Sequence, residues 1–181
     1  MRRVHGKPSL IQSHRPRRMR YVLEVFDEAK EPHKTTAEYY GYAALLMGTA
    51  PALLNRTLAK SLWHLGAAFA HKQFKFYFDA RGMPVGMVTW AFLASDVEDR
   101  FLSDDDPQLH LSEWNEGDSP WIIDFVAPYG NLKHILRDLR DTVFADHDGV
   151  IYSRRRKGAV VTKQIQASPF SYFFRNRRNA S

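Results

Sequence analysis

The sequence predicts a single α+β domain, in which helices flank a mostly antiparallel central sheet. Two segments with apolar residues at helical spacing come first, and segments in which apolar and polar residues alternate follow them, with shorter helical patterns in between. The length of 181 residues and the apolar fraction of 44% suit one folded domain with a substantial core. We find neither an internal repeat nor a long linker that would divide the chain.

The first two predicted elements are helices joined by a short connection. Thr35 and Glu38 have the spacing of a capping box, in which two side chains satisfy helix N-terminal amides, so we expect a helix over 35–47. Pro51 suits a first helical turn, and the apolar spacing after it predicts a second helix over 51–70. Residues 48–50 would then form the joint.

A β-hairpin and a short helix are predicted next. From Gln73 aromatic and polar residues alternate, a turn is expected at 80–82, and the pattern then returns as a second strand. Ser95 and Glu98 repeat the capping-box spacing and predict a helix that ends before the acidic turn at 104–106.

The last third predicts a strand through Trp121–Val126, a helix over 131–144 and a final pair of strands. We divide the chain into a basic N-terminal extension over 1–34, expected to be partly disordered, a folded domain over 35–165, and a basic aromatic tail over 166–181.

The distribution of basic residues indicates which classes of partner the chain could bind. Lys and Arg number 26 against 20 acids, and residues 1–20 hold seven of these cations and no acid. Further clusters lie at Arg154, Arg155, Arg156 and Lys157, and at Arg175, Arg177 and Arg178. Such clusters attract nucleic acid, an anionic membrane surface or an acidic protein, and solvated tails are the alternative interpretation.

Several classes of site lack their sequence signals. There is no cysteine, hence no disulfide or thiol nucleophile, and a reducing cytoplasm is the expected location. No apolar run is long enough to cross a bilayer, and the N-terminus lacks the apolar block of a secretory signal. The eight histidines form no HExxH or similar motif, and no phosphate-binding loop occurs, so we expect no metal and no bound cofactor.

Asp124 is the most informative single residue. It interrupts the apolar run "WIIDFVAPYG", which reads as a buried strand, and a buried carboxylate needs either a partner or a chemical task. The residues alone leave two interpretations open, a catalytic carboxylate or an acid held by Arg or backbone amides. His64 lies among Leu62, Trp63 and Leu65, where a core or interface histidine is the default.

Three segments together resemble a known family. They are "YGYAALLMGTAP", "MPVGMVTWA" and "WNEGDSPWIIDFVAPYG", which span Tyr40 to Gly130. The chain resembles the toxin-activating lysine acyltransferases, the partners of RTX pore-forming toxins. The residues that carry the likeness by order and spacing are Gly41, Pro51, Pro84, Val85, Trp90, Gly117, Asp118, Trp121, Asp124, Ala127, Pro128 and Gly130.

The resemblance implies a GNAT-like fold, named after the acetyltransferases that share it, for the domain over 35–165. It also implies transfer of a fatty acyl group from acyl carrier protein, as co-substrate, to lysines of an RTX-type protoxin in the cytoplasm. Asp124 would act with a catalytic histidine. The substrate-binding residues would be Gly41, Pro51, Trp90 and Trp121. Arg154, Arg155, Arg156 and Lys157 would dock the carrier protein, and a homodimer is left open.

The likeness fails at the catalytic histidine. The family places it in a Ser-Pro-x-His pattern, and the matching positions here are Ala50 and Leu53, neither of which can carry a proton. His64 would lie about 16 Å further along a continuous helix, so it can replace the lost base only if that helix is broken or displaced. Thr49 could restore the hydroxyl but not the base.

Two other functions therefore stay open beside an acyltransferase. One is a noncatalytic relative that binds acyl carrier protein or a toxin, and the other, less favoured, is a basic nucleic-acid-binding module. The discriminating observation is whether a histidine nitrogen lies within hydrogen-bond reach of Asp124. His64 there would favour the enzyme, and aliphatic surroundings would favour the binding protein.

Overall fold

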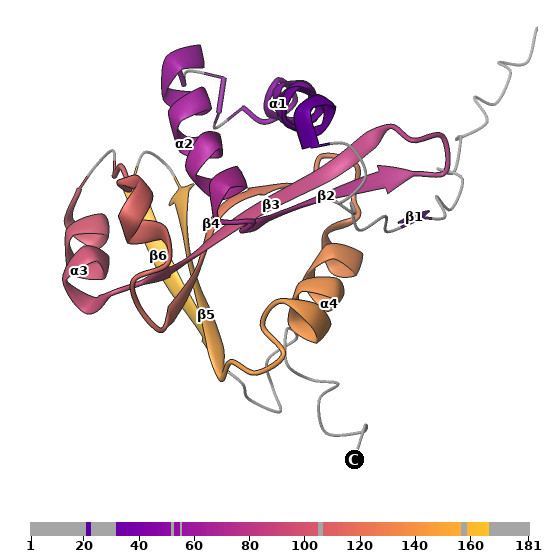
Figure 1. The fold of residues 1–181 in the computed structure, drawn as a ribbon. Coiled ribbons are helices and arrows are strands. Elements are labelled where there is room, and N and C mark those ends of the chain that lie inside the picture. The colour runs from indigo at the N-terminus through magenta and orange to yellow at the C-terminus, as the bar shows by residue number, and fades with distance from the viewer. Residues whose placement is uncertain are drawn as a thin grey trace, which may run out of the picture.

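A six-stranded sheet with helices on both faces forms the molecule (Figure 1). The structure is a computed structural model and describes residues 21–22, 32–51, 53–54, 56–104, 107–156 and 159–166. The helices are α1 Pro32–Met47, α2 Leu58–Ala70, α3 Ser95–Ser103, the short 3-10 helix η1 Leu111–Trp114, and α4 Leu132–Thr142. The strands are β1 Tyr21–Val22, β2 Phe74–Asp79, β3 Pro84–Leu93, β4 Ser119–Val126, β5 Gly149–Arg156 and β6 Ala159–Gln166.

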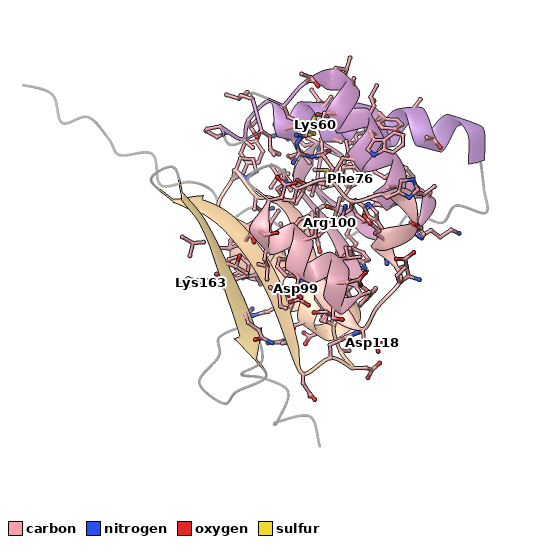
Figure 2. The ribbon with its side chains drawn as sticks, turned by 90° about the vertical axis from the view of Figure 1, so that its left-hand side faces the viewer. Lys60, Phe76, Asp99, Arg100, Asp118 and Lys163 are labelled. Carbon is pink, nitrogen blue, oxygen red and sulfur yellow. The ribbon has the colours of Figure 1, made fainter. Side chains whose placement is uncertain are left out.

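The strands lie in the sheet in their sequence order, and all neighbours are antiparallel except β4 and β5. The α+β class and the mostly antiparallel sheet flanked by helices are therefore confirmed. Figure 2 shows Lys163 on β6, the outer strand at one edge of the sheet. No helix among the described residues has the length and apolar character needed to span a membrane.

Alternation along the strands sends side chains to two separate cores. On one face Phe76, Phe78 and Met87 pack against α1, and on the other Tyr77 and Val88 pack against α4. A third cluster joins α2, α3 and η1 to the sheet through Trp114 and Trp121. Each large side chain that is fully buried in this way stabilises the fold by roughly 1.5–3 kcal/mol. The helices α1 and α2 thus share one face, and α4 covers the other (Figure 1).

The predicted hairpin, the strand through Trp121–Val126, the helix after it and the final strand pair are all confirmed. The predicted N-terminal caps of the first and third helices are wrong. The first helix begins at Pro32, where proline suits the first helical turn, so Thr35 lies inside the helix and does not cap it. The third helix has Ala94 as its N-cap with no side-chain hydrogen bond, so the Ser95 capping box is also wrong.

The predicted start of the second helix is wrong by a functionally important distance. Its N-cap is Thr57, whose hydroxyl accepts a hydrogen bond from the Lys60 amide at 3.3 Å. Pro51, Leu53 and Leu54 lie in turns instead, with the Leu53 amide bonded to the Ala50 carbonyl at 2.9 Å and the Arg56 amide to the Leu53 carbonyl at 3.0 Å. The segment before Thr57 is therefore a separate turn, and His64 lies in the second turn of α2.

Strands β4 and β5 separate soon after they meet. Their parallel ladder consists of two pairs, Trp121 with Ile151 and Ile122 with Tyr152, whereas β4 continues to Val126 and β5 to Arg156. Because the two strands run in the same direction, both continue past the last pair at the same end of the sheet. Asp124 lies two residues beyond that pair, where the strands are no longer joined.

Candidate active site

His64 and Asp124 form a close pair between α2 and β4. His64 Nε2 lies 2.7 Å from Asp124 Oδ2, although the two residues are 60 positions apart in sequence. Both side chains are buried, with 7% of His64 and 5% of Asp124 exposed. The discriminating contact between a histidine nitrogen and this carboxylate is therefore present.

A β-bulge aims Asp124 at α2. Thr89 of β3 pairs with Asp124 and Trp90 pairs with Ile122, so Ile123 is the extra residue of the bulge. In a regular strand, residues two apart share a face, and Asp124 would point with Ile122 toward the core under α4. The bulge reverses this alternation and places the carboxylate on the opposite face, beside His64.

Two further side chains hold the carboxylate. The Thr89 hydroxyl accepts a hydrogen bond from the Asp124 amide at 3.0 Å and donates one to Oδ2 at 3.2 Å. Arg56, in the turn before α2, donates from Nη1 to Oδ1 at 3.4 Å. The two oxygens thus have different partners, His64 and Thr89 on one and Arg56 on the other.

The environment keeps Asp124 ionised. Burial by itself raises the pKa of the carboxyl, but the adjacent His64 and its hydrogen bond, together with the Arg56 guanidinium and the Thr89 hydroxyl, outweigh burial and hold the pKa well below its ordinary value. An ionised carboxylate only accepts hydrogen bonds, so Nε2 of a neutral His64 must carry the proton and donate it. This assignment leaves the lone pair on Nδ1, which has no hydrogen-bond partner among the residues that the structure describes.

Such a pair has the chemistry of a general base. The carboxylate fixes the tautomer and orientation of the imidazole and stabilises the imidazolium that forms when Nδ1 accepts a proton. Trp114 of η1 restrains the ring from another side, with its ring centroid 5.1 Å from that of His64 and an interplanar angle of 69°. The ring is therefore held by a hydrogen bond and by an aromatic contact.

Leu53, at the position where the family has its histidine, is a packing residue in this chain. Leu53 packs, half-buried, against the core between α1 and the sheet. The Thr49 hydroxyl donates to the Leu46 carbonyl at 2.6 Å, at the C-terminal end of α1. The break before Thr57 is the condition under which His64 could replace the lost base, and the structure contains that break.

Arg56 and Thr89 were not found from the sequence. A signal for Arg56 exists, since a buried carboxylate requires a cation or donors and Arg56 follows Leu53 by three residues. Thr89 gave no signal, because its pairing with Asp124 depends on the β3–β4 register and its bulge.

The predicted substrate-binding residues lie in different parts of the fold. Gly41 is exposed on α1, and Pro51 is exposed in the turn before α2. Trp90 is buried in the core under α4, where its ring contacts Phe144. Trp121 is buried in the third core cluster. A role in substrate binding stays a prediction for all four.

The predicted docking cluster lies on β5. Arg154, Arg155 and Arg156 occupy the part of this strand beyond its last pair with β4, and they pair with β6. Their side chains and Lys157 lie outside the described residues. Docking of a carrier protein at this cluster stays a prediction.

Other histidines have structural contacts. His110 is the exposed N-cap of η1, and Nε2 of the half-buried His71 lies 2.7 Å from the Leu111 carbonyl. Within the described ranges, no group of three or more His, Cys, Asp or Glu side chains is arranged to hold a metal ion.

Comparisons with known proteins point to one family. A model of the RTX toxin acyltransferase (HlyC) family matches residues 33–168. The lysine-acyltransferase RtxC of Vibrio cholerae is 30% identical over 60% of this chain and 71% of its own length. The RTX-II toxin-activating lysine-acyltransferase ApxIIC of Actinobacillus pleuropneumoniae is 26% identical over 72% of this chain and 86% of its own length. The protein-lysine myristoyltransferase RtxC of Kingella kingae is 34% identical over 35% of this chain and 40% of its own length.

Proposed function

Because the chain belongs to the RTX toxin acyltransferase family, we propose that it transfers a fatty acyl chain from acyl carrier protein to lysine side chains of an RTX-type protein. The observation that carries this proposal is the 2.7 Å contact between His64 and Asp124. The names of the relatives support lysine as acceptor, and the myristoyltransferase supports a fatty acyl chain.

The first chemical task is removal of a proton from the acceptor. A free lysine has a pKa near ~10.4, so at neutral pH its ammonium must lose a proton before the amine can attack. Nδ1 of His64 takes this proton, and Asp124 balances the positive charge that forms on the imidazole. The dyad therefore converts the acceptor into a nucleophile.

The second task is exchange of the thioester for an amide. Lysine Nζ attacks the thioester carbonyl carbon, the C–N bond forms, the C–S bond breaks, and the proton held by His64 passes to the leaving thiolate. The second proton that Nζ loses on becoming an amide nitrogen passes to solvent. The oxyanion of the intermediate needs hydrogen-bond donors. Beyond Ile122, the edge of β4 that faces β5 has no partner in the ladder of the described strands, so its backbone amides are the candidate donors.

A noncatalytic binding protein fits the site less well. In such a protein, which has lost the family histidine at Leu53, we expect only aliphatic neighbours around Asp124. Instead the carboxylate is ionised and bonded to His64, Thr89 and Arg56. A buried charge that is needed only for packing would be costly to retain, so the site favours catalysis.

Intact-mass spectrometry tests the proposed reaction. A lysine-bearing fragment of an RTX-type protein is incubated with this protein and with acyl carrier proteins charged with fatty acids of different length. We expect a mass gain equal to the acyl chain, and Asp124→Asn should slow it by about 10²–10⁴-fold because the base loses its charge partner.

Asp146→Asn is the matched control, since Asp146 is an exposed acid after α4. Circular dichroism of each variant verifies folding. Equal rates for the wild type and Asp124→Asn would refute the dyad, whereas carrier binding without any mass gain would support the noncatalytic alternative.

A further inference from the structure

Helix α2 exposes large apolar side chains in its first half, although it also buries Leu65, Ala67 and Ala68 in the core. Ser61 and His64 point inward and are buried, whereas Leu58, Leu62 and Trp63 point outward with 71%, 41% and 60% of their surface exposed. A surface helix ordinarily turns charged residues to solvent, and a helix that is apolar on its outer side is ordinarily covered. Lys60 is the only residue of α2 with a permanent charge.

The outer side of α2 belongs to a larger apolar surface. Leu54, in the turn before the helix, is also exposed, and the ring of Trp63 lies 6.5 Å from that of His110, next to the exposed Leu111. We call Leu54, Leu58, Leu62 and Trp63 the α2 face. Several large apolar side chains exposed on one helix and its preceding turn are typical of an interaction site, and tryptophan is a frequent anchor residue in such sites.

The segment of the chain that carries the α2 face contains basic residues and no acid. Glu113, beside His110, is paired with Arg100. Residues 39–78 contain no Asp or Glu, while Arg56, Lys60, Lys72 and Lys75 lie within this stretch. Figure 2 shows Lys60 among α1 and α2 at one end of the molecule and Asp118 at the other. A partner that is apolar in its centre and acidic at its rim is complementary to such a surface.

The size and the charge of the face disfavour a second copy of the chain. A stable interface needs about 800 Å² from each partner, which four side chains on one helix and its preceding turn do not supply. A twofold dimer on this face would also bring Arg56 and Lys60 of both copies together, and like charges repel. A small face suits a partner that binds and leaves in each reaction cycle.

The face adjoins the dyad. Trp63 directly precedes His64 on α2, and Arg56, which is bonded to Asp124, lies in the same turn as Leu54. The side chain of Arg56 is 22% exposed, so it extends from the buried carboxylate to the surface. A partner on the α2 face would therefore contact the helix that carries His64 and lie next to Arg56, which is bonded to Asp124.

We propose that the α2 face is the docking surface for the acidic protein that carries the acyl thioester, an inference that rests on the proposed acyltransferase function. The acidic rim of the carrier meets Arg56 and Lys60, and its apolar side chains cover Leu58, Leu62 and Trp63. This surface is separate from the cluster Arg154–Lys157 on and after β5.

Leu58→Glu tests the docking surface, because Leu58 is the most exposed residue of the face and a carboxylate there repels an acidic carrier. The control is Leu132→Glu at the start of α4, on the opposite side of the sheet, where 48% of the leucine is exposed. Transfer is measured with acyl carrier protein and with a small acyl thioester of N-acetylcysteamine as donors.

We expect Leu58→Glu to raise KM for the acyl carrier protein at least tenfold more than KM for the small thioester, with no such difference for Leu132→Glu. Calorimetric binding of the acyl carrier protein should weaken in parallel. An unchanged carrier KM and affinity would overturn the proposal. So would a higher KM for the acceptor protein alone, or a change from dimer to monomer in sedimentation.

Failure of the proposed function would look different. If the wild type transfers acyl groups from neither donor, the reaction is wrong, and the calorimetric comparison of Leu58→Glu with Leu132→Glu still decides whether the α2 face binds the carrier.

Discussion

At the residue scale, the contacts of Asp124 explain why a carboxylate lies in an apolar strand. Its charge is stabilised by His64, Arg56 and Thr89, and in return it fixes which nitrogen of His64 carries the proton. The imidazole of a base in this position is useful only in one tautomer. In the proposed mechanism the acid therefore acts through the histidine and is not itself the group that takes the lysine proton.

Arg56 tunes the pair, and the pH dependence of the reaction tests this. The charged groups that face His64 are Asp124 from β4 and Arg56 from the turn before α2, while Thr89 and Trp114 are neutral. Removing the cation in Arg56→Met makes it easier for the base to hold a proton, so the acid limb of the kcat/KM profile should move to higher pH.

Arg56→Lys, which keeps the charge, should leave the acid limb near its wild-type position. An unmoved limb in Arg56→Met, alongside wild-type folding, would show that Arg56 does not influence the base.

The sequence identified Asp124 but not the geometry that activates it. An acid between apolar residues is a strong signal, because burial of an unpaired charge is costly. The partner of Asp124 is not predictable in this way, because Leu53 occupies the position expected for the histidine and His64 is too distant along any continuous helix. What could not be anticipated was Thr57, which takes the N-cap and leaves the preceding residues free to turn.

At the element scale, the bulge in β4 is what brings the site together. Strand alternation predicts one face for Ile122 and Asp124, and the extra residue Ile123 separates them. A single sequence gives no signal for such a bulge, so the strand itself was predictable and the direction of its central carboxylate was not.

Gly117, next to β4, should resist substitution. A Cβ there would strike the carbonyl of Leu93 and the amide of Ala94, which are backbone atoms with little freedom to move, and the Gly117 amide donates to the Phe92 carbonyl at 3.0 Å. Gly117→Ala should therefore lower the free energy of unfolding by about 1–3 kcal/mol, measured by denaturant titration.

Gly41→Ala is the matched control, since a Cβ at Gly41 meets nothing within 4 Å on exposed α1. It should raise the free energy of unfolding by about 0.5–1 kcal/mol through helix propensity. The account of the Gly117 contact is wrong if the two variants have equal stability. Loss of acyl transfer in a stable Gly41→Ala would support the predicted role of Gly41 in substrate binding.

At the scale of the whole molecule, the order of elements was enough to predict the fold class. Two helices before a series of alternating segments implied an α+β domain, and the mostly antiparallel sheet followed from the hairpins. Local sequence patterns do not predict the parallel contact of β4 with β5 or their separation beyond Ile122, because the paired residues are far apart in the chain.

Distribution of charge is the other property of the whole molecule. The absence of acids from residues 39–78 is visible in the sequence, but only the fold shows that the same stretch supplies the histidine proposed as the base and a helix face with exposed apolar side chains. Catalysis and recognition of an acidic donor would thus share one end of the molecule.

Chemical rescue tests the central claim, that His64 has taken over the task of the missing histidine, most directly. His64→Ala removes a buried ring and leaves space for a small base beside Asp124. We predict that the single-turnover rate of acyl transfer falls at least about 100-fold and that added imidazole restores part of it. Asp124→Asn should show no rescue. Transfer by His64→Ala at the wild-type rate without imidazole would contradict the account.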